Sequence, residues 1–214
     1  SDYVRGQDWP ANTPITLYIG QDSWTETSNS SGTVYFWLRD YGFDLVGGHQ
    51  LYMSDGVRTV IHTVFPLSVT TIDENADSVS GSTSASTEVE IYGCTSSSCS
   101  ETLSVIADTN GNWMADFSGK LDIIPGTYGW VFQYDDDGNR TEIYWYVPDP
   151  HLVACPSSDY VRGEEWQANS PITLYIGQDS WTKTSNFSGD VYFYLGDYGF
   201  DLVGSQQLRM TDGV

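Results

Sequence analysis

The sequence predicts an all-β protein built from antiparallel β-sandwiches, and three observations lead to that prediction. Apolar and polar residues alternate over short runs, as at Ile15, Leu17 and Ile19, which is the pattern of a strand with one buried face. Turn-forming dipeptides such as Asp55-Gly56 separate these runs. No apolar stripe with the period of a helix reaches helical length in the 214 residues.

A long tandem repeat organises the chain. The first 57 residues return from Ser158 to Val214 at an offset of 157 residues, without a gap and with 13 differences. A fixed long period indicates that each unit is one building block of an array. We therefore expect the natural polypeptide to continue in both directions.

Residues 1–66 are predicted to form the first sandwich. The strand PITLYI is followed by the turn NSSG and the strand TVYFWL, and FDLVGG forms a loop. The segment QLYMSDGVRTVIHTVF is a hairpin in which Asp55-Gly56 makes the tight turn. A second copy that ends at Val214 lacks the counterpart of RTVIHTVF. We expect that edge to be covered, either by continuation of the same chain or by a strand from a neighbour.

Residues 67–150 repeat the same order of strand and turn motifs and are predicted to form the second sandwich. VSG corresponds to VRG, and TEVEIY corresponds to TPITLYI. A second Asp-Gly turn leads into TEIYWYV. Few residues around Pro66 join the two sandwiches, which predicts a stiff junction. Residues 151–157 follow as a Pro-containing linker, expected to be an extended spacer, and residues 158–214 form the incomplete second copy of the first sandwich.

These motifs resemble the bacterial immunoglobulin-like tandem repeats of large secreted or cell-surface proteins. The resemblance covers the whole chain and is carried by V-x-G, P-I-T-L-Y-I or T-x-V-x-I, G-N-W-M-A-D-F, and P-G-x-Y with a closing D-G hairpin. It implies Ig-like sandwiches of about seven short strands in two sheets, two per 157-residue unit. It also implies extracellular scaffolding or adhesion without chemistry of its own. The CTSSSC hairpin departs from the inter-sheet cysteine pair of antibody domains.

Charge excludes one class of partner. Eight Lys and Arg against 29 Asp and Glu give a formal net charge of −21, which repels nucleic acid and anionic membrane surfaces. No apolar run approaches the ~20 residues needed to span a bilayer, so we expect no membrane insertion in this segment. A polar, acidic surface poor in lysine is common in secreted proteins and favours an extracellular or cell-surface location.

Cysteine usage agrees with an extracellular location. Cys94 and Cys99 lie between two strand-like runs, and a disulfide closing that hairpin is expected. The alternative, a pair of metal thiolates, would need two further ligands, and none stands at suitable spacing. Cys155 is left over, either as an intermolecular thiol bonded to another repeat or chain or as an unpaired buried cysteine.

Two further motifs are each open to two interpretations. In YDDDGN, the oxygens of Asp135, Asp137 and Asn139 resemble the start of a calcium loop, and Asp-Gly is equally a hairpin turn. Calcium is the one cofactor considered. Asn29, Asn139 and Asn186 match the N-x-S/T glycosylation pattern, which also arises by chance.

No enzyme is predicted, because the chain has no catalytic motif around its three histidines and no nucleophile elbow. His62 alternates with valines and is interpreted as structural. Trp24 and Trp181 lie in polar GQDSWT segments and are candidates for sugar stacking or for packing against a neighbouring domain. Of Tyr35, Phe36 and Trp37 at least one must face outward.

The sequence thus predicts an extracellular structural repeat protein that forms a stalk or filament and associates with neighbouring repeats or chains. The alternative is an adhesive or carbohydrate-binding module array of a secreted protein, with glycans as partners.

Overall fold

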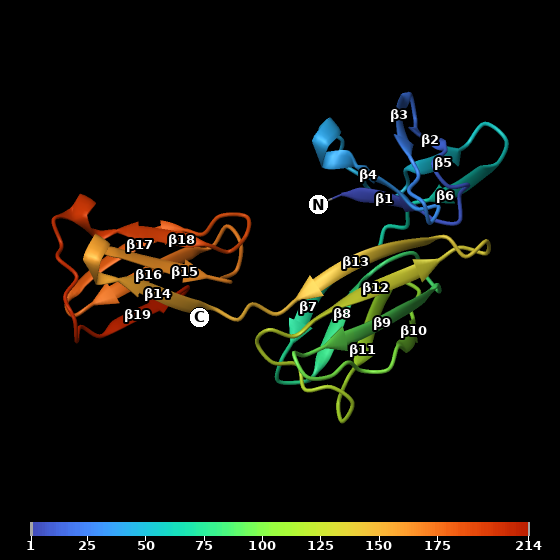
Figure 1. Cartoon of the computed structure of the whole chain (residues 1–214). Helices are drawn as coiled ribbons and strands as arrows, with labels where there is room; N and C mark the ends of the chain where they lie inside the picture. Colours follow the sequence, from blue (N-terminus) through green and yellow to red (C-terminus); the bar gives the residue numbers. More distant parts are fainter. Residues whose placement is uncertain (1, 214) are drawn as a thin grey trace. The chain divides into compact units, whose positions relative to one another are not determined.

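The computed structural model describes residues 2–213, which form antiparallel strands joined by turns and three short 3-10 helices, with no α-helix among them (Figure 1). This confirms the predicted all-β class. The chain divides into two compact units, Ser1–Ile123 with Tyr128–Trp145 and Ile124–Thr127 with Tyr146–Val214. No helix of the described residues is long and apolar enough to cross a bilayer.

The first sandwich belongs to unit 1 and packs a two-stranded sheet, β1-β4, against a four-stranded sheet, β3-β2-β5-β6. Its elements are β1 (Tyr3–Gly6), β2 (Pro14–Ile19), β3 (Asp22–Thr27), β4 (Val34–Trp37), η1 (Leu38–Tyr41), β5 (Gln50–Ser54) and β6 (Thr59–Thr63). Ile15 and Leu17 from the larger sheet and Phe36 from the smaller one are fully buried in one cluster. Burying such side chains stabilises the sandwich by about 1.5–3 kcal/mol each.

The second sandwich belongs to unit 1 as far as Trp145 and has sheets of order β11-β8-β7 and β10-β9-β12-β13. Its strands are β7 (Ser68–Asp73), β8 (Ser78–Ser82), β9 (Glu88–Cys94), β10 (Leu103–Ile106), β11 (Asn112–Asp116), β12 (Tyr128–Tyr134) and β13 (Arg140–Tyr146). Val89, Ile91 and Val131 are fully buried. Each alternates with residues on the opposite face of its strand, so the period-2 pattern of the sequence builds this core as well.

Unit 2 contains the second copy of the first sandwich, with sheets of order β14-β15-β18 and β17-β16-β19. Its elements are β14 (His151–Cys155), η2 (Pro156–Ser158), β15 (Tyr160–Glu164), β16 (Pro171–Ile176), β17 (Asp179–Thr184), β18 (Val191–Tyr194), η3 (Leu195–Tyr198) and β19 (Leu208–Thr211). Ile172 and Leu174 take the buried positions of Ile15 and Leu17, and Phe193 takes that of Phe36.

The segment expected as a Pro-containing linker, residues 151–157, differs from that expectation. Its first five residues form β14, which pairs with β15 from His151 opposite Glu164 to Cys155 opposite Tyr160. The three prolines of this region lie outside these five residues. The backbone N–H groups between them are therefore free to join a sheet, which proline would prevent.

The V-x-G motif has a packing reason. A Cβ atom on Gly6 would lie 2.5 Å from Nε1 of Trp9, and one on Gly163 would lie 2.5 Å from Nε1 of Trp166. The tryptophan of each copy covers the glycine, and any side chain there would displace the indole.

Candidate functional site

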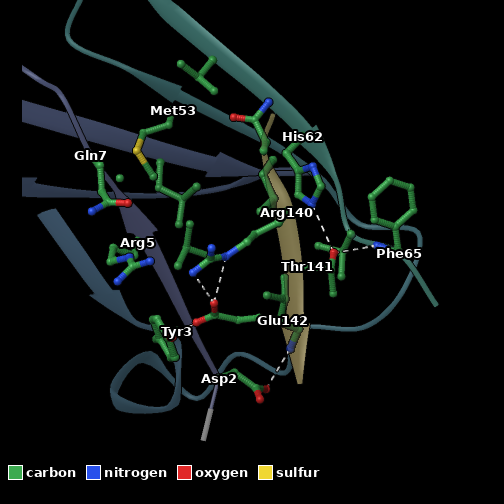
Figure 2. Close-up of a pocket in the computed structure, with 18 of the residues that line it drawn as sticks. Asp2, Tyr3, Arg5, Gln7, Met53, His62, Phe65, Arg140, Thr141 and Glu142 are labelled. Atoms are coloured by element: carbon green, nitrogen blue, oxygen red, sulfur yellow. Dashed lines mark hydrogen bonds and ion pairs between the residues drawn. The ribbon is translucent and has the colours of Figure 1, made fainter. Parts of the chain in front are cut away.

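The side chain of His62 joins the two sandwiches of unit 1. It projects from β6, is only 10% exposed, and lies between two side chains of the second sandwich. Its Nδ1 is 2.8 Å from Oδ2 of Asp135, and its Nε2 is 3.1 Å from Oγ1 of Thr141. Figure 2 shows His62 and Thr141 directed toward each other, from β6 and β13.

A neutral His62 ring satisfies this network completely. When Nδ1 carries the proton, it donates to the Asp135 carboxylate, and Nε2 accepts the hydroxyl proton of Thr141. The Thr141 oxygen then still accepts the backbone N–H of Phe65, at 2.9 Å. Every polar atom has a partner, as buried polar groups require. The side chain of His62 thus links the two sandwiches through hydrogen bonds.

Asp135 organises the second half of this contact. Its Oδ1 accepts the backbone N–H groups of Asp137 (3.1 Å) and Asn139 (2.8 Å), which closes the hairpin turn. The Nδ2 of Asn139 donates to the backbone carbonyl of Ile61 at 3.3 Å, across the two sandwiches. Burial acts to raise the pKa of Asp135, but hydrogen bonds from His62 and Asn139 outweigh it and hold the pKa below its ordinary value of 3.8.

A second group of contacts lies around Glu142 of β13. Tyr3 of β1 donates its hydroxyl hydrogen to Glu142, and Nη2 of Arg140 lies 2.9 Å from Oε2 of the same carboxylate. Burial and the bond to Glu142 raise the pKa of Tyr3 to about 12. The Arg140 guanidinium also lies 4.7 Å from the ring centroid of Phe132, a cation–π contact.

A cavity of about 500 Å³ remains between the first sandwich and β13, with Arg5, Gln7 and Met53 of the first sandwich among its lining residues (Figure 2). Among its polar lining residues, His62, Asn139, Arg140, Thr141 and Glu142 are engaged in the ion pair and hydrogen bonds just described. In residues 2–213, no group of three His, Cys, Asp or Glu side chains could hold a metal ion.

The residues considered for calcium lie in this contact. The Asp135 carboxylate accepts N–H groups of the turn. Asp108, in the similar sequence DTNGN, accepts the backbone N–H groups of Asn110 and Asn112 at 2.8 Å each. A carboxylate that accepts the N–H groups two and four residues later is typical of the first residue of a hairpin turn. Calcium at Asp135, Asp137 and Asn139 stays a prediction.

The three glycosylation candidates differ in their surroundings. Asn29 and Asn186 lead equivalent turns, with Oδ1 accepting the N–H groups of the residues two and four positions later. The Nδ2 of Asn139 is already engaged with Ile61 and Asp135. Attachment of a glycan at Asn139 would break the contact between the sandwiches, so Asn29 and Asn186 are the more suitable acceptors. All three stay predictions.

Trp24 and Trp181 are half-buried and lie beside the cores of their sandwiches. The Trp24 ring stacks on Tyr41 with centroids 5.4 Å apart, and the ring of Trp181 lies 5.7 Å from that of Tyr198, tilted by 33°. These contacts are within each sandwich. They leave part of each indole open for either role predicted from the sequence.

Other aromatic residues are more exposed. Tyr35 and Trp37 are 41% and 50% exposed, because Phe36 between them points into the core. Their rings stack at 5.9 Å and 9°. Sequence reasoning missed another cluster, in which Tyr92, Tyr128, Trp130 and Tyr144 contact one another across β9, β12 and β13. The alternation of aromatic residues in YGWVFQY is the signal that indicates it.

The cysteines are placed as follows. Cys94 and Cys99 form a disulfide at the end of the β9–β10 hairpin. Cys155 is a free, half-buried thiol at the end of β14, with Sγ 3.4 Å from Oγ of Ser157. Hydrogen bonds from Ser157 and Ser158 lower the pKa of Cys155. Its intermolecular pairing stays a prediction.

No protein-family model matches the chain, and no curated protein matches it. Among solved structures, it is similar to a tetra-tandem repeat in the extending region of a large adhesion protein, with 16% identity and a TM-score of 0.26, over 89% of this chain and 61% of that one. The chain is also similar to a Ca²⁺-stabilized adhesin that helps an Antarctic bacterium reach out and bind ice. The identity is 18% and the TM-score 0.25, over 98% of this chain and 66% of that one. A third similar structure is that of a 1.5-MDa bacterial ice-binding adhesin, with 17% identity and a TM-score of 0.23, over 91% of this chain and 81% of that one.

The chain spans less than two thirds of the length of the first two of these structures. The first of the three is described as a large adhesion protein, and the other two are described as adhesins.

Proposed function

We propose that this chain is a segment of a non-catalytic extracellular repeat protein, in which paired sandwiches act as stiff spacers of a surface stalk. The observation that carries the proposal is the engagement of both ring nitrogens of His62 by the neighbouring sandwich. Two sandwiches joined by a flexible hinge would not need a buried, fully bonded side chain at their junction.

Several contacts support stiffness at this junction together. Besides His62, the amide of Asn139, the hydroxyl of Thr141 and the hydroxyl of Tyr3 each bond across the two sandwiches. A hinge motion between the sandwiches would have to break several of these bonds at once. A stretch of 57 residues that returns nearly unchanged at an offset of 157 residues supports the role of spacer, since a repeated unit sets a repeated length.

Electron microscopy of the native material tests the proposal. Rods with a regular axial repeat, lost in a protein carrying His62→Ala and Thr141→Val, are expected. Freely bent threads in the unaltered protein would contradict a stiff spacer. Uniform laterally packed fibres would instead support the filament form of the same structural role.

A second function, adhesion through carbohydrate binding, is favoured by the exposed pair Tyr35 and Trp37. These two exposed aromatic rings lie side by side and supply apolar ring surface against which a sugar ring could pack. A glycan array tests this function. Binding that is lost in Trp37→Ala but kept in Trp24→Ala would support it, and the absence of any glycan ligand would reject it.

A further inference from the structure

The larger sheet of the second sandwich carries aromatic rings on its outer face. In β12, Gly129 and Val131 are buried, so Trp130 between them points outward. Tyr92 of the neighbouring strand β9 lies opposite Trp130, with ring centroids 5.6 Å apart (Figure 1). The outer face of a sandwich sheet usually carries polar side chains, so an aromatic cluster there indicates contact with a partner.

The cluster around Trp130 is accessible and already ordered. Tyr144 is 55% exposed, and Tyr92, Tyr128 and Trp130 are half-buried. The rings of Tyr128 and Tyr144 meet the indole at 81° and 66°, with centroids 5.8 and 5.2 Å away. Such edge-to-face contacts hold the rings in place. A ligand therefore meets a surface that does not have to be ordered on binding.

The same sheet face shows, further along β12, how a cation is held on a ring. The guanidinium of Arg140 lies 4.7 Å from the ring centroid of Phe132, and its Nη2 is 2.9 Å from Oε2 of Glu142. Phe132 is only 8% exposed. A guanidinium is attracted both by the face of the ring and by the carboxylate beside it.

Trp130 and Tyr92 have the ring and the carboxylate of this arrangement without the cation. Glu90 precedes Tyr92 by two residues on the same face of β9 and lies opposite Phe132, one diagonal step from Trp130. In residues 2–213, Glu90 forms no hydrogen bond or ion pair. No Lys or Arg side chain of those residues lies over the rings of Tyr92 or Trp130.

Charge decides which kind of ligand fits these groups. The chain has eight Lys and Arg against 29 Asp and Glu, and four of its cations already lie over other rings, namely Arg58, Arg140, Lys183 and Arg209. The formal net charge of −21 attracts a cation from outside the molecule. A neutral glycan gains nothing from this charge, so charge complementarity favours a cationic ligand.

We infer that the cluster around Trp130, together with Glu90, is a docking site for an arginine-bearing segment of a partner protein. The guanidinium stacks on the aromatic rings and pairs with the Glu90 carboxylate, as Arg140 does with Phe132 and Glu142. The inference depends neither on the spacer function nor on the glycan surface at Tyr35 and Trp37.

Two capped peptides added to the whole chain test the site. One is acetyl-Gly-Arg-Gly-Arg-Gly-amide, and the other carries citrulline, a neutral analogue of similar shape, in place of each arginine. We expect the arginine peptide alone to shift the indole N–H resonance of Trp130 saturably, with an affinity that falls as salt is added. Equal shifts with both peptides, or with neither, overturn the inference. So does a shift caused by neutral cellotetraose in the absence of a response to arginine, which would identify a glycan site.

Protein variants separate the site from the general attraction of an acidic protein. Glu90→Gln keeps the shape of the side chain and is expected to bind the arginine peptide about fivefold more weakly. Glu74→Gln is the matched control, because it removes the same charge from the turn between β7 and β8, in the other sheet. Equal losses in the two variants would mean that net charge alone attracts the peptide, which overturns the inference.

A second pair of variants tests the ring. Trp130→Leu is expected to weaken binding of the arginine peptide at least about fivefold, measured by calorimetry, with an unchanged circular dichroism spectrum as evidence of folding. Tyr18→Leu is the control, since Tyr18 is 45% exposed on a strand of the first sandwich. Unchanged affinity in a folded Trp130→Leu protein overturns the inference.

Discussion

The Nδ1 atom of His62 lies 2.8 Å from Oδ2 of Asp135, although the two residues are 73 positions apart in the sequence. The distance joins the last strand of the first sandwich to the hairpin turn of the second. Because this turn is itself held by the Asp135 carboxylate, the local structure of one sandwich and its contact with the other depend on the same side chain.

Removal of the His62 ring should weaken unit 1. In His62→Ala, the Asp135 carboxylate and the Thr141 hydroxyl lose a partner in a half-buried site, and we expect the free energy of unfolding to fall by about 1–3 kcal/mol. Urea denaturation measures it. His151→Ala is the control, because His151 is 51% exposed and its pairing with Glu164 is expected to contribute little.

A double-mutant cycle locates the effect. His62→Ala and Thr141→Val should be non-additive by at least about 0.5 kcal/mol, since the two side chains bond to each other. Additive losses would mean that the histidine stabilises only its own sandwich.

Acid should loosen the same contact. The pKa of Asp135 is lower in the folded protein than in the unfolded chain, so protonation favours unfolding. The stabilisation is present above about pH 4 and is lost as the pH falls through the folded-state pKa. In Asp135→Asn, unfolding between neutral pH and pH 3 should depend less on pH, and an unchanged profile would contradict this assignment.

Alkali should act on Tyr3. Its pKa is raised from 10.0 to about 12, so its contribution to stability is complete below pH 10 and is lost as the pH rises toward 12. Spectrophotometric titration should show one late-ionising tyrosine fewer in Tyr3→Phe. Tyr146, whose pKa is also raised to about 12 by burial and by its bond to Glu165, provides the comparison in unit 2.

The disulfide should contribute modestly, because it closes a short loop. Replacing Cys94 and Cys99 by serine is expected to lower the free energy of unfolding by about 2 kcal/mol. Alkylation of the unfolded, unreduced protein followed by mass measurement should label Cys155 alone. Labelling of all three cysteines would contradict the disulfide.

A chelator should leave the melting curve of unit 1 unchanged. To bind at Asp135, calcium would have to displace the backbone N–H groups and the His62 imidazole from which the Asp135 carboxylate accepts hydrogen bonds. A fall in melting temperature on adding chelator, reversed by calcium, would show that the turn binds the ion.

Local patterning predicted most of the fold because strand faces are set by neighbours in the sequence. The alternation around Leu17 and the Asp-Gly turns are sufficient for that. β14 was not predicted because the prolines around it suggested an extended spacer, whereas pairing with Glu164 and Tyr160 is decided by residues that follow later in the chain.

The candidate site was harder to predict for the same reason. His62 was interpreted as a structural side chain, but its partners Asp135 and Thr141 are distant in sequence, and nothing local to His62 indicates them. The aromatic cluster around Trp130 could have been read from the alternation in β12. Its contact with Tyr144 depends on the pairing of strands.

The pairing of β14 with β15 also determines where a protein fragment has to begin in order to contain a complete sandwich. A recombinant fragment that starts at Ser158 would lose the strand covering β15 and expose a bare sheet edge. Expression of single modules should therefore begin upstream of His151, and a protease cut between β14 and β15 should release a fragment prone to aggregate.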